Sequence, residues 1–386
     1  MKKIVNIFTI CVFSLVLVIP FIFTNRDKEA VSETDNRALA DNPITVSLSG
    51  TRYADAVNNY YNDRIGFRDE LIDFNGRIAY QIFRQSPVEK VILGQDGWLF
   101  YSSEKASDGV SISQYMGTKI YSEEELQLIA DNLIKTRDYL AERNCEFVLY
   151  IAPNKERVYS EYMPESYQNI RTSELCGTDQ IIDYLRENTD IRVVWPYEEL
   201  VSYMEEHPEE PTYFHLDTHW NELGGYIGAK ALLDELGIEI ESADIINKSK
   251  NTAINQGDLR NMMAVDDWLL MEETGWQIDG FPAKNTVIEE ESFYGHWRYY
   301  NEDKDSRTLL VNRDSFTSAM RLELGSSFNN VDLCHRASYT PDLIAEDNPD
   351  IFVYETVERN VDELKDLHLI PEEQDVTEKM HKIKEP

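Results

Sequence analysis

Cysteine is scarce in this chain, which excludes one common way of stabilising an exported protein. Four cysteines occur in 386 residues, and Cys11 lies in an apolar N-terminal run. The other three, Cys145, Cys176 and Cys334, are few and odd in number, so no disulfide framework is expected. Cys145 and Cys334 lie in apolar, strand-like runs, where cysteine is usually a small buried residue.

Basic side chains are also few. The chain has 37 Lys and Arg against 71 Asp and Glu, a formal net charge of −34. Nucleic-acid binding needs a basic surface, so that class of function is excluded, and docking on anionic lipid is disfavoured. We interpret the charge as a dispersed, solvated acidic surface. Hydrophobic residues make up 42% of the chain, enough for a sizeable core in one large domain or two ordinary ones.

The first 24 residues predict a membrane anchor. Lys2 and Lys3 precede an apolar run of about twenty residues, Ile4 to Phe23, which is long enough for a helix that spans a bilayer. Lysines before the run and an acidic chain after it place the bulk of the protein outside the cytoplasm. No good cleavage site follows, so we favour an uncleaved signal anchor over a cleaved signal peptide. Cys11 lacks the preceding small residues of a lipidation site.

After the anchor, the pattern changes from helical to alternating. Residues 25–50 predict a polar tether, and residues 51–90 have helical spacing. From residue 91, strands alternate with helices, which indicates crossover connections and a mostly parallel sheet. The expected strands are 91–94, 97–101, 147–151, 191–195, 308–311, 331–334 and 351–354, and the expected helices are 123–143, 178–187, 221–236, 316–324 and 341–346. Ser122 and Glu125 form a capping box for the helix at 123–143.

Two segments depart from this alternation. Residues 240–306 are polar and rich in Asn, Asp and Glu, so we interpret them as a long insertion in a domain that spans residues 91–371. Residues 372–386 form a charged tail that is expected to fray.

The candidate chemistry lies where strands end and helices begin. In open parallel sheets, ligands bind beyond the carboxyl ends of the strands. Ser315 follows the expected strand 308–311 and stands at the start of a helix, where free N–H groups can stabilise an oxyanion. His219 can accept the proton of a serine, and Asp217, two residues earlier, can orient the imidazole.

Spacing alone leaves alternatives open. Ser315 can be a helix cap without chemistry, because Asp and Ser are common at that position. A second serine pair, Ser326 and Ser327, lies between a helix end and a strand, and we interpret it as a decoy. His215, Asp217 and His219 alternate along the chain and can share a face as metal ligands, but no fourth ligand is evident, so no metal is expected.

The motifs resemble those of a known group: the SGNH-hydrolase-like proteins related to periplasmic alginate O-acetyltransferases, including the DHHW-type proteins of Gram-positive bacteria. The strongest matches are Asp217-Thr218-His219-Trp220-Asn221 and Asp314-Ser315-Phe316, and weaker matches are residues 59–69, 94–100, 152–155 and 349–359. The resemblance covers most of the chain after the anchor. It departs from the pattern at Thr218, where a His is typical, and at Arg313, where many SGNH enzymes have Gly.

The resemblance implies a fold and a set of roles. The fold is a flavodoxin-like, three-layer α/β/α SGNH domain with a mostly parallel sheet, and the triad of Asp217, His219 and Ser315 has a permuted order. The group needs no cofactor. Asn154, Arg313, Asn360 and Trp220 are tentative substrate or oxyanion contacts.

The resemblance also implies a function outside the membrane. It is O-acetylation of a cell-envelope or secreted polysaccharide through an acetyl-serine intermediate, beside a membrane-bound O-acyltransferase. The alternatives are a carbohydrate acetyl-esterase of the same fold and a catalytically silent, membrane-tethered glycan-binding protein. The aromatics Trp98, Tyr101, Trp220, Trp297, Tyr299 and Tyr300 are more often core or surface residues than a sugar platform.

Overall fold

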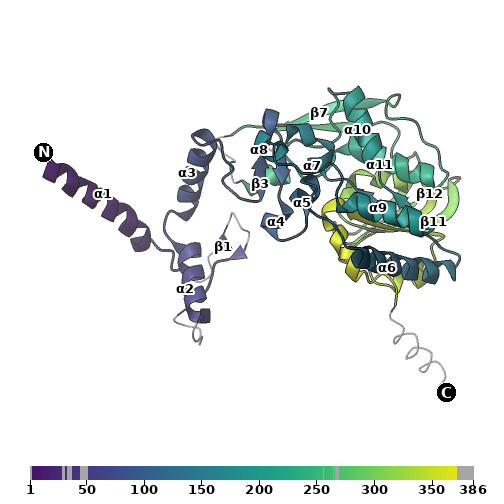
Figure 1. Cartoon of the computed structure of the whole chain (residues 1–386), viewed down its shortest axis with the longest axis horizontal. Helices are drawn as coiled ribbons and strands as arrows, with labels where there is room; N and C mark the ends of the chain where they lie inside the picture. The colour runs from purple at the N-terminus through teal and green to yellow at the C-terminus, as the bar shows by residue number, and fades with distance from the viewer. Residues whose placement is uncertain are drawn as a thin grey trace, which may run out of the picture. The chain divides into compact units, whose positions relative to one another are not determined.

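The chain divides into two compact units (Figure 1). The computed structural model describes residues 2–27, 31–32, 37–43, 51–254, 256–263, 265 and 269–371. One unit, here the N-terminal unit, comprises Met1–Pro87 with Met263–Trp268, and the other, the main unit, comprises Val88–Met262 with Leu269–Pro386. The predicted charged tail at 372–386 lies outside the described residues.

The N-terminal unit begins with the apolar helix α1, Lys2–Ile22. Its segment Val5–Ile22 is long and apolar enough to cross a membrane, by length and composition. The polar segment that follows contains a short antiparallel ribbon of β1, Val31–Ser32, and β2, Arg37–Ala38.

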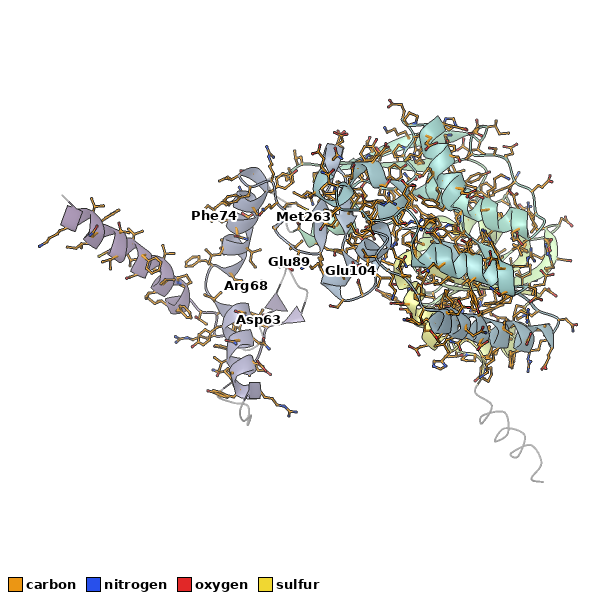
Figure 2. The ribbon with its side chains drawn as sticks, viewed as in Figure 1. Asp63, Arg68, Phe74, Glu89, Glu104 and Met263 are labelled. Carbon is orange, nitrogen blue, oxygen red and sulfur yellow. The ribbon has the colours of Figure 1, made fainter. Side chains whose placement is uncertain are left out.

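The helical region expected at 51–90 contains two helices. α2 covers Thr51–Arg64 and α3 covers Arg68–Gln81, with Phe67 between them at φ 61°. Figure 2 shows Asp63 near the end of α2 and Phe74 on α3. The Asp63 carboxylate accepts the N–H of Ala40 at 2.8 Å, and Arg64 Nε donates to the Ala40 carbonyl at 2.7 Å. The end of α2 therefore holds the last described part of the polar segment.

The main unit is built on a seven-stranded sheet, counted over the described residues. Its strands, in spatial order, are β6 Arg192–Val194, β5 Glu146–Ala152, β13 Ile351–Val357, β11 Asp305–Arg313, β12 Phe328–His335, β10 His296–Tyr300 and β9 Val287–Glu290. In this spatial order, neighbouring strands pair in parallel from β6 through β5, β13 and β11 to β12. β10 runs antiparallel to both β12 and β9. The sheet is therefore mixed, and the expectation of a mostly parallel sheet missed its antiparallel edge.

This edge comes from the segment interpreted as an insertion. β9 and β10 lie within 240–306, and β10 pairs along its length with β12. The same segment contains the antiparallel pair β7, Lys248–Ile254, and β8, Glu272–Ile278, with α12, Asp258–Met262, between them. β9 is exposed on every residue, so no apolar alternation marks it. β10 does alternate between half-buried and buried residues, but this five-residue pattern lies within a polar segment.

Side chains from the two faces of the sheet enter two separate hydrophobic cores. Along β5, Val148, Tyr150 and Ala152 enter one core, and Phe147, Leu149 and Ile151 enter the other, as the two-residue period of a strand requires. The first core is covered by α10 Tyr197–Glu206, α11 Glu222–Glu235 and α13 Arg321–Ser327, and the second by α6 Glu123–Ala141, α9 Gly177–Asn188, α14 Leu343–Asp347 and the 3-10 helix η5 Glu358–Asp366. Figure 1 shows α6 and α11 on opposite sides of the strands. The unit is thus a three-layer α/β/α domain.

The remaining elements are short. They are β3 Val91–Leu93 and β4 Leu99–Tyr101, which pair around the 3-10 turn η2 Gln95–Gly97, then α4 Ser103–Ala106, α5 Ser111–Tyr115, α7 Lys155–Val158, η3 Ser160–Tyr162, α8 Glu165–Gln168 and η4 Phe316–Ala319. The predicted capping box at Ser122 and Glu125 is present at the start of α6. Cys145, Cys176 and Cys334 are buried, free thiols.

Glycines in α11 let this helix pack closely under Trp220. A Cβ at Gly228 would lie 2.6 Å from the Tyr150 hydroxyl and 2.8 Å from the Trp220 ring. A Cβ at Gly224 would lie 2.1 Å from the Thr212 carbonyl oxygen. Both approaches are too short for a real side chain, so the position of α11 depends on these two glycines.

We predict that Gly228→Ala destabilises the main unit. The new methyl meets two buried, fixed groups, and overpacking of this kind costs about 1–3 kcal/mol. Thermal or urea unfolding measures the loss. Gly76→Ala is the matched control, because its Cβ would meet Pro87 at an ordinary 3.6 Å and α3 gains a better helix former. Equal stability of Gly228→Ala and wild type would contradict the packing argument.

Candidate active site

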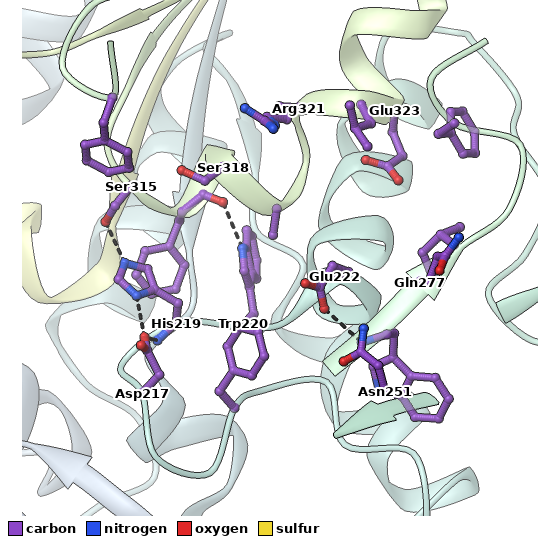
Figure 3. Close-up of a pocket in the computed structure, with 18 residues that line it drawn as sticks. Asp217, His219, Trp220, Glu222, Asn251, Gln277, Ser315, Ser318, Arg321 and Glu323 are labelled. Atoms are coloured by element: carbon purple, nitrogen blue, oxygen red, sulfur yellow. Dashed lines mark hydrogen bonds and ion pairs between the residues drawn. The ribbon is translucent and has the colours of Figure 1, made fainter. Parts of the chain in front are cut away.

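Asp217, His219 and Ser315 form a hydrogen-bonded chain (Figure 3). His219 Nδ1 lies 2.6 Å from Asp217 Oδ1, and His219 Nε2 lies 2.7 Å from Ser315 Oγ. The three side chains that the sequence singled out are therefore in contact, although Ser315 is 96 residues from His219. This is the geometry in which a histidine can take a serine proton while a carboxylate orients the ring.

The histidine is presented by a tight hairpin-like loop. Tyr213 and Trp220 form an antiparallel bridge, and the N–H of Phe214 donates to the His219 carbonyl at 3.2 Å. Asn221 then caps α11, because its side-chain oxygen accepts the N–H groups of Leu223 and Gly224 at 3.0 and 3.2 Å. The loop and the helix cap together hold the direction of the imidazole.

A buried lysine holds the other side of this loop. Lys155 Nζ donates to the carbonyls of Phe214, His215 and Asp217 at 3.0, 3.2 and 2.6 Å, which uses all three of its donors. Burial lowers the pKa of Lys155 to about 8, although the nearby carboxylates, Glu156 foremost, raise it. The sequence marked Lys155 only as part of a weak family motif and did not indicate this role.

The serine stands on a turn that two buried carboxyl groups organise. Asp314 Oδ1 accepts the N–H of Phe316 at 2.7 Å and Oδ2 accepts the N–H of Val357 at 2.8 Å. Glu355 Oε2 accepts the N–H of Asp314 at 2.7 Å and the Thr317 hydroxyl at 2.9 Å. Burial, and then the charge of Asp314, raise the pKa of Glu355 well above its usual value.

The expected α-helix at 316–324 is wrong in detail. Ser315 precedes a four-residue 3-10 turn, η4, and α13 starts only at Arg321. The N–H of Phe316 is bonded to Asp314, so it is not one of the free donors that the sequence argument invoked. Local hydrogen bonds of the Asp314 side chain compete with regular helix at this point.

Trp220 ties the histidine loop to the serine turn. Its indole N–H donates to the Phe316 carbonyl at 2.9 Å, and the two rings pack edge to face with centroids 5.3 Å apart. The Phe316 ring also lies 4.9 Å from the His219 ring, centroid to centroid. Trp220 is 1% exposed, yet it borders the cavity that contains Ser315.

The other tentative contact residues lie elsewhere. Arg313 is fully buried, donates to the carbonyls of Leu333 and Phe293 at 3.2 and 2.8 Å, and stacks 3.6 Å from the Trp297 ring centroid. Asn154 accepts the N–H of Arg359 at 3.2 Å, and its buried Nδ2 has no hydrogen-bond partner among the described residues. Neither these residues nor Asn360 are among the described residues that line the cavity of Ser315.

The metal alternative does not assemble as proposed. His215 faces away from the Asp217–His219 pair: its ring lies 4.1 Å from the Trp98 ring, centroid to centroid, and its Nδ1 lies 3.4 Å from Glu273. Asp258 takes the third position instead, close to Asp217 and His219.

The two serines interpreted as a decoy make hydrogen bonds outside this site. Ser327 donates to the Glu323 carbonyl at 2.7 Å, and Ser326 accepts the N–H of Ala283 at 2.9 Å.

Asp258 is a residue of the site that the sequence did not reveal. Its N–H donates to Asp217 Oδ2 at 2.8 Å, and its carboxylate accepts the Thr218 N–H and hydroxyl at 2.8 and 2.6 Å. Burial, followed by the charge of Asp217, raises the pKa of Asp258. It comes from the polar segment 240–306, where one Asp among many gives no local signal.

Asp217 is ionised over the whole physiological range. Burial is the largest influence and raises its pKa, but the hydrogen bond and charge of His219 and the N–H groups of Asp258 and His219 together lower the pKa to about 2. A permanently charged carboxylate beside Nδ1 stabilises the imidazolium that forms when the ring accepts a proton.

The site opens into a cavity of about 720 Å³ that aromatic and polar side chains line. Ser315 and His219 lie at one end, as Figure 3 shows, and Glu222, Gln277 and Glu323 lie at the other. The volume is within the range of small-ligand sites.

A family model described as SGNH hydrolase-like domain, acetyltransferase AlgX, matches residues 91–310. The chain belongs to this family. The match includes Asp217 and His219 and ends before Ser315. Assignment to this SGNH-hydrolase-like family confirms the resemblance that the motifs carry.

The chain spans about half the length of the curated relatives that it matches. "Probable alginate O-acetylase AlgJ" of Pseudomonas putida is 30% identical over 226 residues, which cover 57% of this chain and 54% of that protein. The protein of the same name from Pseudomonas syringae pv. tomato is 22% identical over 231 residues, 58% of this chain and 53% of that protein. The structure of Bacillus cereus PatB1 is 16% identical, covers 70% of this chain and 96% of that chain, and has a TM-score of 0.50, which supports the fold.

We predict that Asp217→Asn lowers stability in a pH-dependent way. The pKa of Asp217 is depressed in the folded state, so its ionised form contributes stability that is fully present above about pH 4 and is lost as the pH falls toward about pH 2. The depressed pKa contributes about 2 kcal/mol to the free energy of unfolding at neutral pH. The variant loses less than this, because removing the charge of Asp217 also removes its repulsion with Asp258. Urea unfolding at neutral and acidic pH measures it.

The control is Asp183→Asn, which removes the same charge from an exposed position on α9. It should match wild type at every pH. A stability gap between Asp217→Asn and wild type that stays constant from neutral to acidic pH would contradict the assignment of a stabilised carboxylate.

Proposed function

We propose that this protein is an O-acetyltransferase that modifies a polysaccharide through Ser315, His219 and Asp217. The observation that carries the proposal is the continuous hydrogen-bonded chain at 2.6 and 2.7 Å from carboxylate to imidazole to hydroxyl, at one end of an open cavity. Family membership and the names of the alginate O-acetylase relatives support acyl transfer to a sugar polymer.

The proposed reaction has two balanced halves. Ser315 Oγ attacks the carbonyl of an acetyl ester while its proton moves to His219 Nε2, and the leaving oxygen then takes that proton. A sugar hydroxyl next gives its proton to His219 and attacks the acetyl-serine, and Ser315 Oγ leaves and is reprotonated. Asp217 stays ionised and stabilises the imidazolium in both halves.

The buried turn around Asp314 and Glu355 supports this chemistry by holding Ser315. A serine whose backbone is tied on both sides needs no rearrangement when the histidine takes its proton. The Trp220–Phe316 hydrogen bond joins the loop of His219 to the turn of Ser315. It therefore supports a short distance between the imidazole and the serine hydroxyl.

We propose that α1 anchors the protein in a membrane with the main unit outside the cytoplasm. The apolar segment Val5–Ile22, the two lysines before it and the acidic chain after it support this topology. A membrane-bound O-acyltransferase beside the anchor would supply the acetyl group.

Ser315→Ala should abolish covalent labelling by a serine-reactive fluorophosphonate and lower acetyl-ester turnover by at least about 10³-fold, because the nucleophile is lost. In-gel fluorescence and ester hydrolysis measure the two effects. Ser327→Ala is the matched control and should label like wild type. If Ser327→Ala loses the label and Ser315→Ala keeps it, the assignment of the nucleophile is wrong.

The second test separates transfer from hydrolysis. Purified full-length protein with a chromogenic acetyl ester and an oligosaccharide should yield acetylated sugar, detected by mass spectrometry. Release of acetate alone, with acceptor present, would make the protein an esterase. A folded wild-type protein without any label would favour a glycan-binding role.

A further inference from the structure

The end of the cavity away from Ser315 contains polar groups that acyl transfer itself does not require. They are Glu222, Asn251, Gln277, Arg321 and Glu323 (Figure 3). They lie beside Trp276 and Phe281, whose rings also line the cavity. Aromatic faces combined with amide, hydroxyl and carboxyl groups are suited to a sugar, which has apolar ring faces and polar edges.

The charge of this region is negative. Glu222 is exposed at the cavity (Figure 3), and its Oε2 accepts the N–H of Trp276 at 2.9 Å. Asp217 carries a second negative charge at the other end, where His219 and Asp258 surround it. The carboxylates therefore flank the space that an acceptor must enter.

Arg321 does not offset these charges freely. It is the one Lys or Arg among the described residues that line the cavity. Its Nη1 lies 2.9 Å from Glu290 Oε1, and its guanidinium lies 4.9 Å from the Trp297 ring centroid. The carboxylate of Glu290 therefore offsets the charge of this guanidinium.

Two uncharged groups, one carboxyl and one hydroxyl, complete the lining. Glu323 is 3% exposed, and burial raises its pKa to about 8, with the charge of Glu222 adding to the effect, so its carboxyl is mostly protonated at neutral pH. Ser318 Oγ is buried and has no hydrogen-bond partner among the described residues. Both groups can donate to and accept from the hydroxyls of a neutral sugar, and neither adds a charge to the cavity.

We propose that the acceptor is a glycan without carboxylates, and that Glu222 excludes polyuronates from the cavity. The inference rests on the proposed transferase function and specifies its substrate class. Like charges placed together across a binding site suppress the wrong partner, and the net charge of −34 adds a repulsive field at longer range. The acceptor would thus differ from alginate, a polyanion, although alginate stands in the names of the relatives.

The field at Ser315 can be measured without knowing the acceptor. Full-length protein in detergent is labelled at Ser315 with three arylsulfonyl fluorides, one cationic, one neutral and one anionic, and each rate is divided by that of the neutral probe. We expect the cationic probe to react about tenfold faster than the anionic one at low salt, with a smaller ratio at about 0.5 M salt.

Glu222→Gln is the decisive variant. It keeps an oxygen for the Trp276 N–H and removes the charge, so the ratio of cationic to anionic labelling should fall toward one. Glu239→Gln is the matched control, because it removes the same charge from an exposed residue that is not among those lining the cavity. Its ratio should stay at the wild-type value.

Acceptor competition tests the substrate class directly. Oligosaccharides of equal length are offered with one acetyl ester: a neutral glucan, a glucosamine polymer and a polyuronate. We expect acetylation of the first two to exceed that of the uronate about tenfold in wild type, and the gap to narrow in Glu222→Gln.

The outcomes separate this inference from the proposed function. Equal labelling by cationic and anionic probes, or a uronate acetylated as well as the neutral glycan, overturns the inference and leaves the triad intact. A protein in which no probe labels Ser315 overturns the proposed function, and the acceptor assignment with it.

Discussion

The contact between Trp220 and Phe316 is the interaction on which the site depends. The indole N–H donates to the Phe316 carbonyl across 96 residues of sequence, and the rings pack against each other beside His219. One partner lies just before α11 and the other just after β11, so this contact joins the loop that carries His219 to the turn that carries Ser315. The glycines of α11 permit it, because a Cβ at Gly224 or Gly228 would collide with Trp220 or its neighbours.

Buried ionisable groups do the local positioning. Asp314 and Glu355 bind backbone N–H groups around Ser315, and Lys155 binds three carbonyls of the histidine loop. A buried polar group without partners is costly, so each of these groups is stable only when the surrounding backbone has its native shape. The turn and the loop are therefore held in single conformations, which suits a site that must align a hydroxyl with a ring nitrogen.

The segment at 240–306 shows how much a polar stretch can contribute. It adds β9 and β10 to the sheet, forms the β7–β8 wall of the cavity and supplies Asp258 beneath Asp217. Its side chains help to line the end of the cavity away from Ser315. The lining of the cavity includes side chains that this segment provides, such as Asn251, Trp276 and Gln277.

Local patterns in the sequence were sufficient for the buried strand at 147–151, for the capped helix after Ser122 and for the motifs around Asp217 and Ser315, because each depends on neighbouring residues only. The helix expected at 316–324 failed because the Asp314 carboxylate, held by the distant Val357 N–H, bonds the Phe316 N–H and tightens the first turn. The antiparallel edge was not predicted because β9 is exposed and has no apolar alternation, and because the short alternating run of β10 lies within a polar segment. The sequence by itself determined the residue types that can carry acyl transfer. Only the tertiary structure decided that Ser315 meets His219, that His215 does not share its site and that Asp258 does, because hydrogen bonds between segments far apart in the chain depend on how the sheet and α11 pack.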